Sequence, residues 1–239
     1  VNGKLLVNSN ATPPNVPTLA STTRSNQTGG MAIVSYVGDG NASQVAHNLG
    51  TQPGFIVVKD RGNTADWPVY HSGFSNPVNN VNILNNATAV QTITDYWTGT
   101  DSNVIGLKSG TWAHNTSGRN YIAYVFAPRE GFSAFGKFNG NSSSFGEFQH
   151  TGFRVGFLML TGTSANRDWI MLDSARDPVN IAENYLYPQS HGAEVTYDMV
   201  DFLSNGFQMR YSGGMFNNTG EQYIWVAFAE NPFKTARAR

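Results

Sequence analysis

The side chains of this sequence that could do chemistry are scattered and match no known catalytic arrangement. The acids are dispersed, without the D-x-[DN]-x-[DN]-G loop that holds calcium. No G-x-S-x-G elbow and no phosphate-binding glycine motif occurs. Five histidines are present, none of them in an HxH or HExxH spacing: His47, His71, His114, His150 and His191. The sequence therefore predicts no catalytic site, no metal site and no cofactor.

Two acids, Asp66 and Asp168, each directly precede a tryptophan. A carboxylate beside an indole ring could bind a sugar, and a suitably spaced pair of carboxylates could cleave a glycosidic bond. A structural role fits the same residues, because Asp caps polar loops and Trp anchors a following strand in the core. We favour the structural role for both pairs.

The composition indicates many short strands joined by tight turns. The 239 residues include 26 Asn and 25 Gly, which tolerate the positive φ of turns, and 13% are aromatic, which favours strands. A net charge of −1 argues against nucleic acid or an anionic membrane as a partner. Cysteine is absent, which excludes disulfides, and no apolar run approaches the length needed for membrane insertion.

The chain contains an internal repeat at an offset of 102 residues, without a gap. Most of the matched residues are glycines, aromatics and aliphatics, which set turns and cores. The matches include Gly54-Phe55 with Gly156-Phe157, Asp66-Trp67 with Asp168-Trp169, Asn115 with Asn217, Tyr121-Ile122 with Tyr223-Ile224, and Phe126-Ala127 with Phe228-Ala229. We interpret this pattern as two copies of one module.

The predicted fold class is all-β, with two tandem copies of a β-sandwich or jelly-roll-like module after an extended N-terminal arm. The predicted boundaries are an arm and linker at 1–30, a first module at 31–132, a second module at 133–233 and a solvated tail at 234–239. Only Pro178–Tyr187 has a weak helical pattern.

The arm is expected to be extended because its Pro, Asn, Ser and Thr residues cannot bury enough apolar area to order it. The short apolar patch Leu5-Leu6-Val7 allows two interpretations: a frayed terminus, which we favour, or a strand that docks on a neighbouring subunit.

Several phrases resemble a family of tandem-domain bacteriophage tail-fibre-like virion structural proteins. They are Gly38-Asp39-Gly40, the stretch from His47-Asn48-Leu49-Gly50 to Lys59, Trp67-Pro68-Val69-Tyr70-His71, and the closing stretches Tyr121–Ala127 and Tyr223–Phe233. The second copy departs from this pattern, with Gln149-His150-Thr151-Gly152 at the place of the His-Asn-Leu-Gly turn. The resemblance covers about residues 33–233 and carries no catalytic residues.

The resemblance implies a non-enzymatic virion protein: a tail fibre, an adhesin or a capsid-decorating component, with a contribution to host attachment. It further implies a homotrimer, other virion proteins as partners, and a location in the virion after assembly in the host cytoplasm.

An alternative is a carbohydrate-binding module that recognises a glycan of the host surface. Tyr96, Trp97 and Trp112 lie in loop-like stretches that do not match between the copies, and we expect these rings to be exposed for stacking on sugar. A third and more remote hypothesis is a polysaccharide depolymerase.

Overall fold

The computed structural model describes residues 4–6 and 16–232, and within these ranges the chain is all-β, as predicted. Strands here are short and separated by Gly- and Asn-rich turns. The described part contains no helix, and so none long and apolar enough to span a membrane. The strands are β1 (Lys4–Leu6), β2 (Ser21–Asn26), β3 (Met31–Val37), β4 (Ser43–Ala46), β5 (Phe55–Asp60), β6 (Pro68–His71), β7 (Asn80–Ile83), β8 (Gln91–Thr92), β9 (Val104–Leu107), β10 (Asn120–Phe126), β11 (Ser133–Asn139), β12 (Phe148–His150), β13 (Val155–Gly162), β14 (Ile170–Asp173), β15 (Ala182–Tyr185), β16 (Val195–Leu203), β17 (Gly206–Met209) and β18 (Gln222–Ala229).

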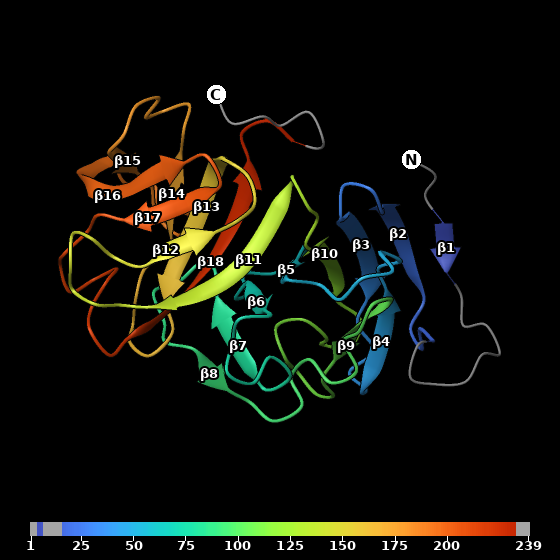
Figure 1. The fold of residues 1–239 in the computed structure, drawn as a ribbon. Coiled ribbons are helices and arrows are strands. Elements are labelled where there is room, and N and C mark those ends of the chain that lie inside the picture. Colours follow the sequence, from blue (N-terminus) through green and yellow to red (C-terminus); the bar gives the residue numbers. More distant parts are fainter. Residues whose placement is uncertain (1–3, 7–15, 233–239) are drawn as a thin grey trace. The chain divides into compact units, whose positions relative to one another are not determined.

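The chain divides into two compact units, drawn mainly in blue to green and in yellow to red in Figure 1. The first comprises residues 1–84 and 91–128, and the second comprises residues 85–90 and 129–239. The first unit has a large sheet of order β1-β2-β3-β10-β5-β6-β7-β8 and a small sheet of order β4-β9. The second unit has two four-stranded sheets, of orders β11-β18-β13-β14 and β12-β17-β16-β15.

We call the eight-stranded sheet of the first unit and the sheet with β18 in the second unit the large sheets, and the sheets β4-β9 and β12-β17-β16-β15 the small sheets. The large sheets of the two units repeat the same antiparallel ladder. In the first unit β10 lies between β3 and β5, and in the second β18 lies between β11 and β13. The register also repeats at the offset of 102, since Met31 pairs with Phe126 and Ser133 pairs with Phe228. In both units, therefore, the last strand in the sequence is a central strand of the large sheet.

Each unit buries its core between its large and small sheets, as a β-sandwich does. In the second unit Trp225 of β18 meets Phe207 of β17 edge to face, with ring centroids 5.3 Å apart. In the first unit Tyr36 of β3 stacks on Tyr121 of β10 at 5.3 Å, and the core also includes Ile105 of β9. Apolar runs such as Phe55–Val58 in β5 and Leu158–Leu160 in β13 supply these buried strands.

A buried asparagine holds the loops of each unit. In the first unit Asn115 Nδ2 donates to the carbonyls of Asn41 (2.6 Å) and Lys108 (3.1 Å). In the second, Asn217 Nδ2 donates to the carbonyls of Ser143 and Tyr211, both at 2.9 Å. Both asparagines are fully buried, and both side-chain oxygens accept a backbone N–H from the turn after the first strand of the module. The amide thus satisfies buried backbone groups that water cannot reach.

Residues 21–26 of the predicted arm are extended, as expected, but they belong to the first unit and do not form a linker outside it. This segment is β2, which pairs with β3 along its whole length and buries the side chains of Ser21 and Thr23. Backbone hydrogen bonding to β3 orders the segment despite its polar composition. β1 in turn pairs with β2, so Leu5 and Leu6 are not frayed, whereas Val7 lies outside the described residues.

The expectation of a helix at Pro178–Tyr187 is also wrong. Residues 182–185 form β15, which pairs with β16 and buries Ala182 and Tyr185 in the second core. Tertiary packing has overridden a weak local preference. The predicted tail at 234–239 lies outside the described residues.

A glycine in β9 is required by close packing in the first unit. A Cβ atom at Gly106 would overlap the backbone carbonyl of Thr98, which crosses β9 at this point. At Gly62, by contrast, the nearest atom to an added Cβ is 3.9 Å away, and the backbone there has no positive φ.

We therefore predict that Gly106→Ala lowers the free energy of unfolding by about 1–3 kcal/mol, because the loop at Thr98 must move. Gly62→Ala is the control and should change it by less than about 0.5 kcal/mol. Urea unfolding followed by circular dichroism measures both. Equal stability of the two variants would contradict the close approach.

Candidate binding site

Two of the three rings predicted to stack on sugar are buried instead. Trp97 is 0% exposed and Tyr96 is 2% exposed. The loop that carries them folds back on the first unit, where the backbone N–H of Trp97 donates to the Val78 carbonyl at 2.9 Å and the Trp97 ring meets Tyr70 edge to face. The sequence could not reveal this, because an aromatic pair in a loop is equally compatible with exposure and with covering the core. The prediction that Trp97 and Tyr96 are exposed is wrong.

Trp112, the third predicted ring, lines a hollow together with the buried Tyr96. It is half-buried, meets Tyr96 edge to face at 5.8 Å, and has the Lys108 ammonium 5.8 Å from its ring centroid. We call this hollow, of about 420 Å³, the Trp112 hollow. Its lining residues are Ala65, Asp66, Val81, Ile83, Gln91, Ile93, Tyr96, Thr111, Trp112, Ala113, Thr116 and Arg119.

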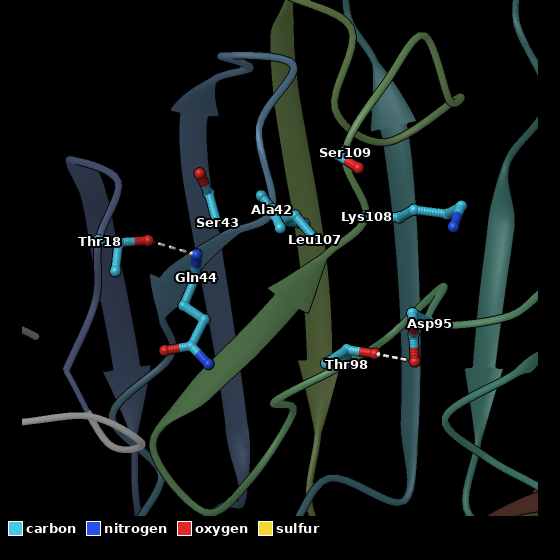
Figure 2. Close-up of a pocket in the computed structure, with 9 residues that line it drawn as sticks. All are labelled: Thr18, Ala42, Ser43, Gln44, Asp95, Thr98, Leu107, Lys108 and Ser109. Carbon is cyan, nitrogen blue, oxygen red and sulfur yellow. Dashed lines mark hydrogen bonds between the residues drawn. The ribbon is translucent and has the colours of Figure 1, made fainter.

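A second hollow, of about 360 Å³, lies over the small sheet of the first unit, and we call it the β4–β9 hollow. Figure 2 shows its lining: Thr18, Ala42, Ser43, Gln44, Asp95, Thr98, Leu107, Lys108 and Ser109. Thr18 accepts the Gln44 backbone N–H at 2.8 Å, and Thr98 donates to the Asp95 carboxylate at 3.0 Å, as drawn in Figure 2.

The groups around the β4–β9 hollow suit hydrogen bonding to a polar ligand. Asp95 has φ of 61°, a conformation uncommon for a residue other than glycine, and its N–H donates to Asn79 Oδ1. Lys108 Nζ donates to the Thr94 carbonyl at 2.7 Å. One carboxylate, one ammonium, an amide and several hydroxyls are therefore available. Sequence reasoning missed this hollow, because its residues come from four separate segments of the chain.

Neither hollow contains the carboxylate pair that glycoside hydrolysis requires. Asp66 is the only acid that lines the Trp112 hollow, and Asp95 is the only acid that lines the β4–β9 hollow. Among the described residues, no group of three or more His, Asp or Glu could hold a metal ion.

The tryptophans that follow Asp66 and Asp168 differ between the units. Trp169 is fully buried and anchors β14, whereas Trp67 is half-buried with the Lys59 ammonium over its ring. Asp168 accepts a hydrogen bond from Gln189 Nε2 at 2.6 Å, and Asp66 is exposed. The anchoring role predicted for the tryptophans is therefore clearest in the second unit.

Other acids in the first unit serve the fold. Burial opposes ionisation of Asp60, but hydrogen bonds from the Gly62 N–H, Asn63 and Arg119 outweigh it and lower the Asp60 pKa. Asp101 caps the start of β9 by accepting the N–H groups of Asn103 and Val104. Such carboxylates fix turns and are poorly placed to exchange protons with a ligand.

The buried histidines of the first unit are structural as well. Burial lowers the pKa of His114 to about 3, and its ring stacks on Tyr96 with centroids 4.2 Å apart. Burial also lowers the pKa of His47, whose Nε2 lies 3.0 Å from the Asp101 carbonyl. His71 is buried, and its Nδ1 accepts the Gly73 N–H at 2.9 Å. His47 and His114 therefore pack in their neutral form, and His71 Nδ1 caps a turn.

The fold and its hollows define a tandem β-sandwich protein whose candidate sites suit binding by hydrogen bonds and ring contacts. The chain belongs to a domain family of unknown function (DUF7483), which it matches over residues 7–232. No curated protein and no solved structure matches the chain.

The buried histidines predict a loss of stability in mild acid. In the unfolded chain a histidine gains its proton near pH 6.5, whereas folded His114 stays neutral down to about pH 3. Stability is therefore complete above pH 6.5 and declines below it, by about 2 kcal/mol at pH 5 for His114 alone. His47 acts in the same direction.

Urea unfolding at about pH 7 and pH 5 measures this loss. The pKa values of Asp39 and Asp60 are lowered from 3.8, so these carboxylates destabilise the fold only at lower pH and do not affect this comparison. His150→Asn, which changes an exposed ring, should keep the wild-type pH dependence. An unchanged free energy of unfolding between the two pH values would contradict the prediction.

Proposed function

We propose that this chain is a non-enzymatic structural protein of a bacteriophage particle: a tail fibre, an adhesin or a capsid-decorating component that contributes to host attachment. It assembles as a homotrimer in the host cytoplasm and functions in the virion beside other virion proteins. The sequence resemblance motivates this proposal. The observation that carries it is that the polar groups shared by the two units make hydrogen bonds that hold loops and turns of the fold.

The shared contacts are those that hold a framework. The Gly38 N–H donates to Arg119 O at 2.9 Å, and the Gly140 N–H donates to Glu221 O at 2.8 Å, at the same offset of 102. The two buried asparagines likewise make corresponding contacts in both units. The residues that line the hollows, by contrast, differ between the copies, with the exception of Asp66, which corresponds to Asp168. Duplication with retention of loop-holding contacts is what a stiff particle component requires.

The absence of paired acids in either hollow favours a non-enzymatic role over a depolymerase. Incubation of the full chain with polysaccharide from the host surface should leave the polymer length unchanged. A fall in chain length, measured by size-exclusion chromatography, would overturn the non-enzymatic proposal.

The proposed trimer predicts a native mass of three times the 26.0 kDa of one chain. On heating, the oligomer and the β-sheet signal should be lost together in one cooperative transition, because subunit contacts contribute to the stability of the fold. Native mass spectrometry and circular dichroism during heating measure the two losses. Dissociation to folded monomers well below the melting temperature would count against the trimer.

The location in the virion has its own test. Gold-labelled antibody against the chain should decorate purified particles of a phage that encodes it, and the labelled structure, tail or capsid, would assign its position. Purified particles that lack the chain would overturn the proposal.

Carbohydrate recognition is the second candidate function, and the Trp112 hollow favours it. A half-buried ring beside Asp66, Gln91 and Arg119 offers an apolar face with donors and acceptors around it, the combination that binds a pyranose. The arrangement is specific to the first unit, because Gly214 stands at the position that corresponds to Trp112.

We predict that Trp112→Ala weakens binding of the full chain to a host glycan by about tenfold, since one stacking ring is removed. Trp67→Ala, at another half-buried indole of the same unit, is the control. A glycan array of host-surface oligosaccharides measures both. Equal binding by wild type and Trp112→Ala would exclude this hollow.

A further inference from the structure

The second unit exposes large aromatic side chains. Phe145 is 69% exposed and Phe148 is 40% exposed, and they lie at and just before β12. Exposed rings this large cost hydration free energy unless they serve an interaction. At the offset of 102, the corresponding residues of the first unit are Ser43 and Ala46, which are both small and buried.

Polar side chains continue from these rings across the small sheet. Gln208 of β17 pairs with Phe148 of β12 on one side and with Asp201 of β16 on the other. Arg210 lies two residues beyond Gln208, on the same face, and its guanidinium carbon is 4.6 Å from the Phe145 ring centroid. Arg210 Nη1 lies 3.6 Å from Asp201 Oδ2. We call these five residues the β12–β17 face.

This face is open because one segment has a different conformation in the two units: it is a loop in the first and part of a strand in the second. In the first unit the loop at Trp97 and Thr98 crosses β9, and Gly106 is required beneath it. At the corresponding positions of the second unit, Val200 belongs to β16 and pairs beside β17. Gln208 corresponds to Gly106, so this position carries a side chain in the second unit, and Gln208 Nε2 donates to the Gly146 carbonyl at 3.0 Å.

We propose that the β12–β17 face binds a neutral polysaccharide. Two exposed rings offer apolar surfaces to the C–H faces of pyranose units. Beside them, Arg210 and Gln208 can donate hydrogen bonds and Asp201 can accept them, as the vicinal hydroxyls of a sugar require. A sheet face presents these groups along a surface, which suits a polymer better than a small molecule. The inference rests on the carbohydrate-recognition candidate function and assigns it a surface in the second unit.

The charges on the face select a neutral polymer. The positive charge of Arg210 is balanced by Asp201, and the neighbouring Glu147 is exposed and negative. An anionic polysaccharide or a nucleic acid would need a surplus of positive charge, which these groups do not provide.

Affinity gel electrophoresis of the full chain tests the proposal. The gels contain hydroxyethyl cellulose, laminarin or galactomannan as neutral polymers, and alginate as an anionic polymer. At least one neutral polymer should retard the wild-type chain, and alginate should not. The double substitution Phe145→Ala with Phe148→Ala should weaken binding by about tenfold, because two stacking rings are lost. Arg210→Lys should also weaken it, since the planar donor fork is lost.

Tyr197→Ala is the matched control, because Tyr197 is a 54% exposed aromatic of the same unit that lies outside the β12–β17 face. Its binding should stay within about twofold of wild type. Circular dichroism verifies that each variant is folded. Three results would overturn the proposal: no retardation by any neutral polymer, retardation by alginate alone, or a double variant that binds like wild type and differs only in oligomeric mass.

Trp112→Ala in the same gels separates the two sites. If binding is lost in Trp112→Ala and kept in the double phenylalanine variant, the first-unit hollow recognises the sugar and the β12–β17 face does not. The reverse pattern supports the β12–β17 face and excludes the Trp112 hollow.

Discussion

One buried amide in each unit connects loops that the strands alone would leave apart. Folding a loop onto a sandwich removes backbone carbonyls from water, and each must find a donor or cost about 1–3 kcal/mol. Asn115 and Asn217 supply two donors each to such carbonyls. In the first unit one acceptor is the carbonyl of Lys108, whose side chain lines the β4–β9 hollow. The geometry of that hollow therefore depends on a contact that is itself wholly structural.

The two units keep the same ladders in their large sheets and differ in what covers their small sheets. In the first, the loop at Trp97 and Thr98 buries an aromatic cluster over β9 and leaves polar hollows around its margins. In the second, β16 extends the sheet, and the face beside it is open. A duplicated framework thus presents two unlike surfaces. Selection for recognition would act on these surfaces, while the turns and core positions remain under the common constraint of folding.

The strands with apolar runs could be predicted from sequence. Glycine and asparagine turns mark their ends, and the repeat shows the same strand pattern a second time, 102 residues later. β2 could not, since Ser21–Asn26 has no apolar alternation and is ordered by backbone pairing to β3. The burial of Trp97 could not be predicted from sequence either, because the sequence does not show that a loop folds back over a core. The exposed rings of Phe145 and Phe148 were visible only as departures from the repeat, and their exposure required the packing of β16 against β17.

The order of β10 and β18 in the sequence has a consequence for folding during synthesis on the ribosome. Each of these strands is the last of its unit to be made, yet each lies between two earlier strands of the large sheet. While translation proceeds, β3 and β5 must wait with unpaired inner edges until Phe126 has emerged, and β11 and β13 wait in the same way for β18. Long-range pairing of this kind folds slowly and leaves nascent edges open to association. During this interval β2 can pair with the outer edge of β3, whereas no strand of the described residues pairs with the outer edge of β11.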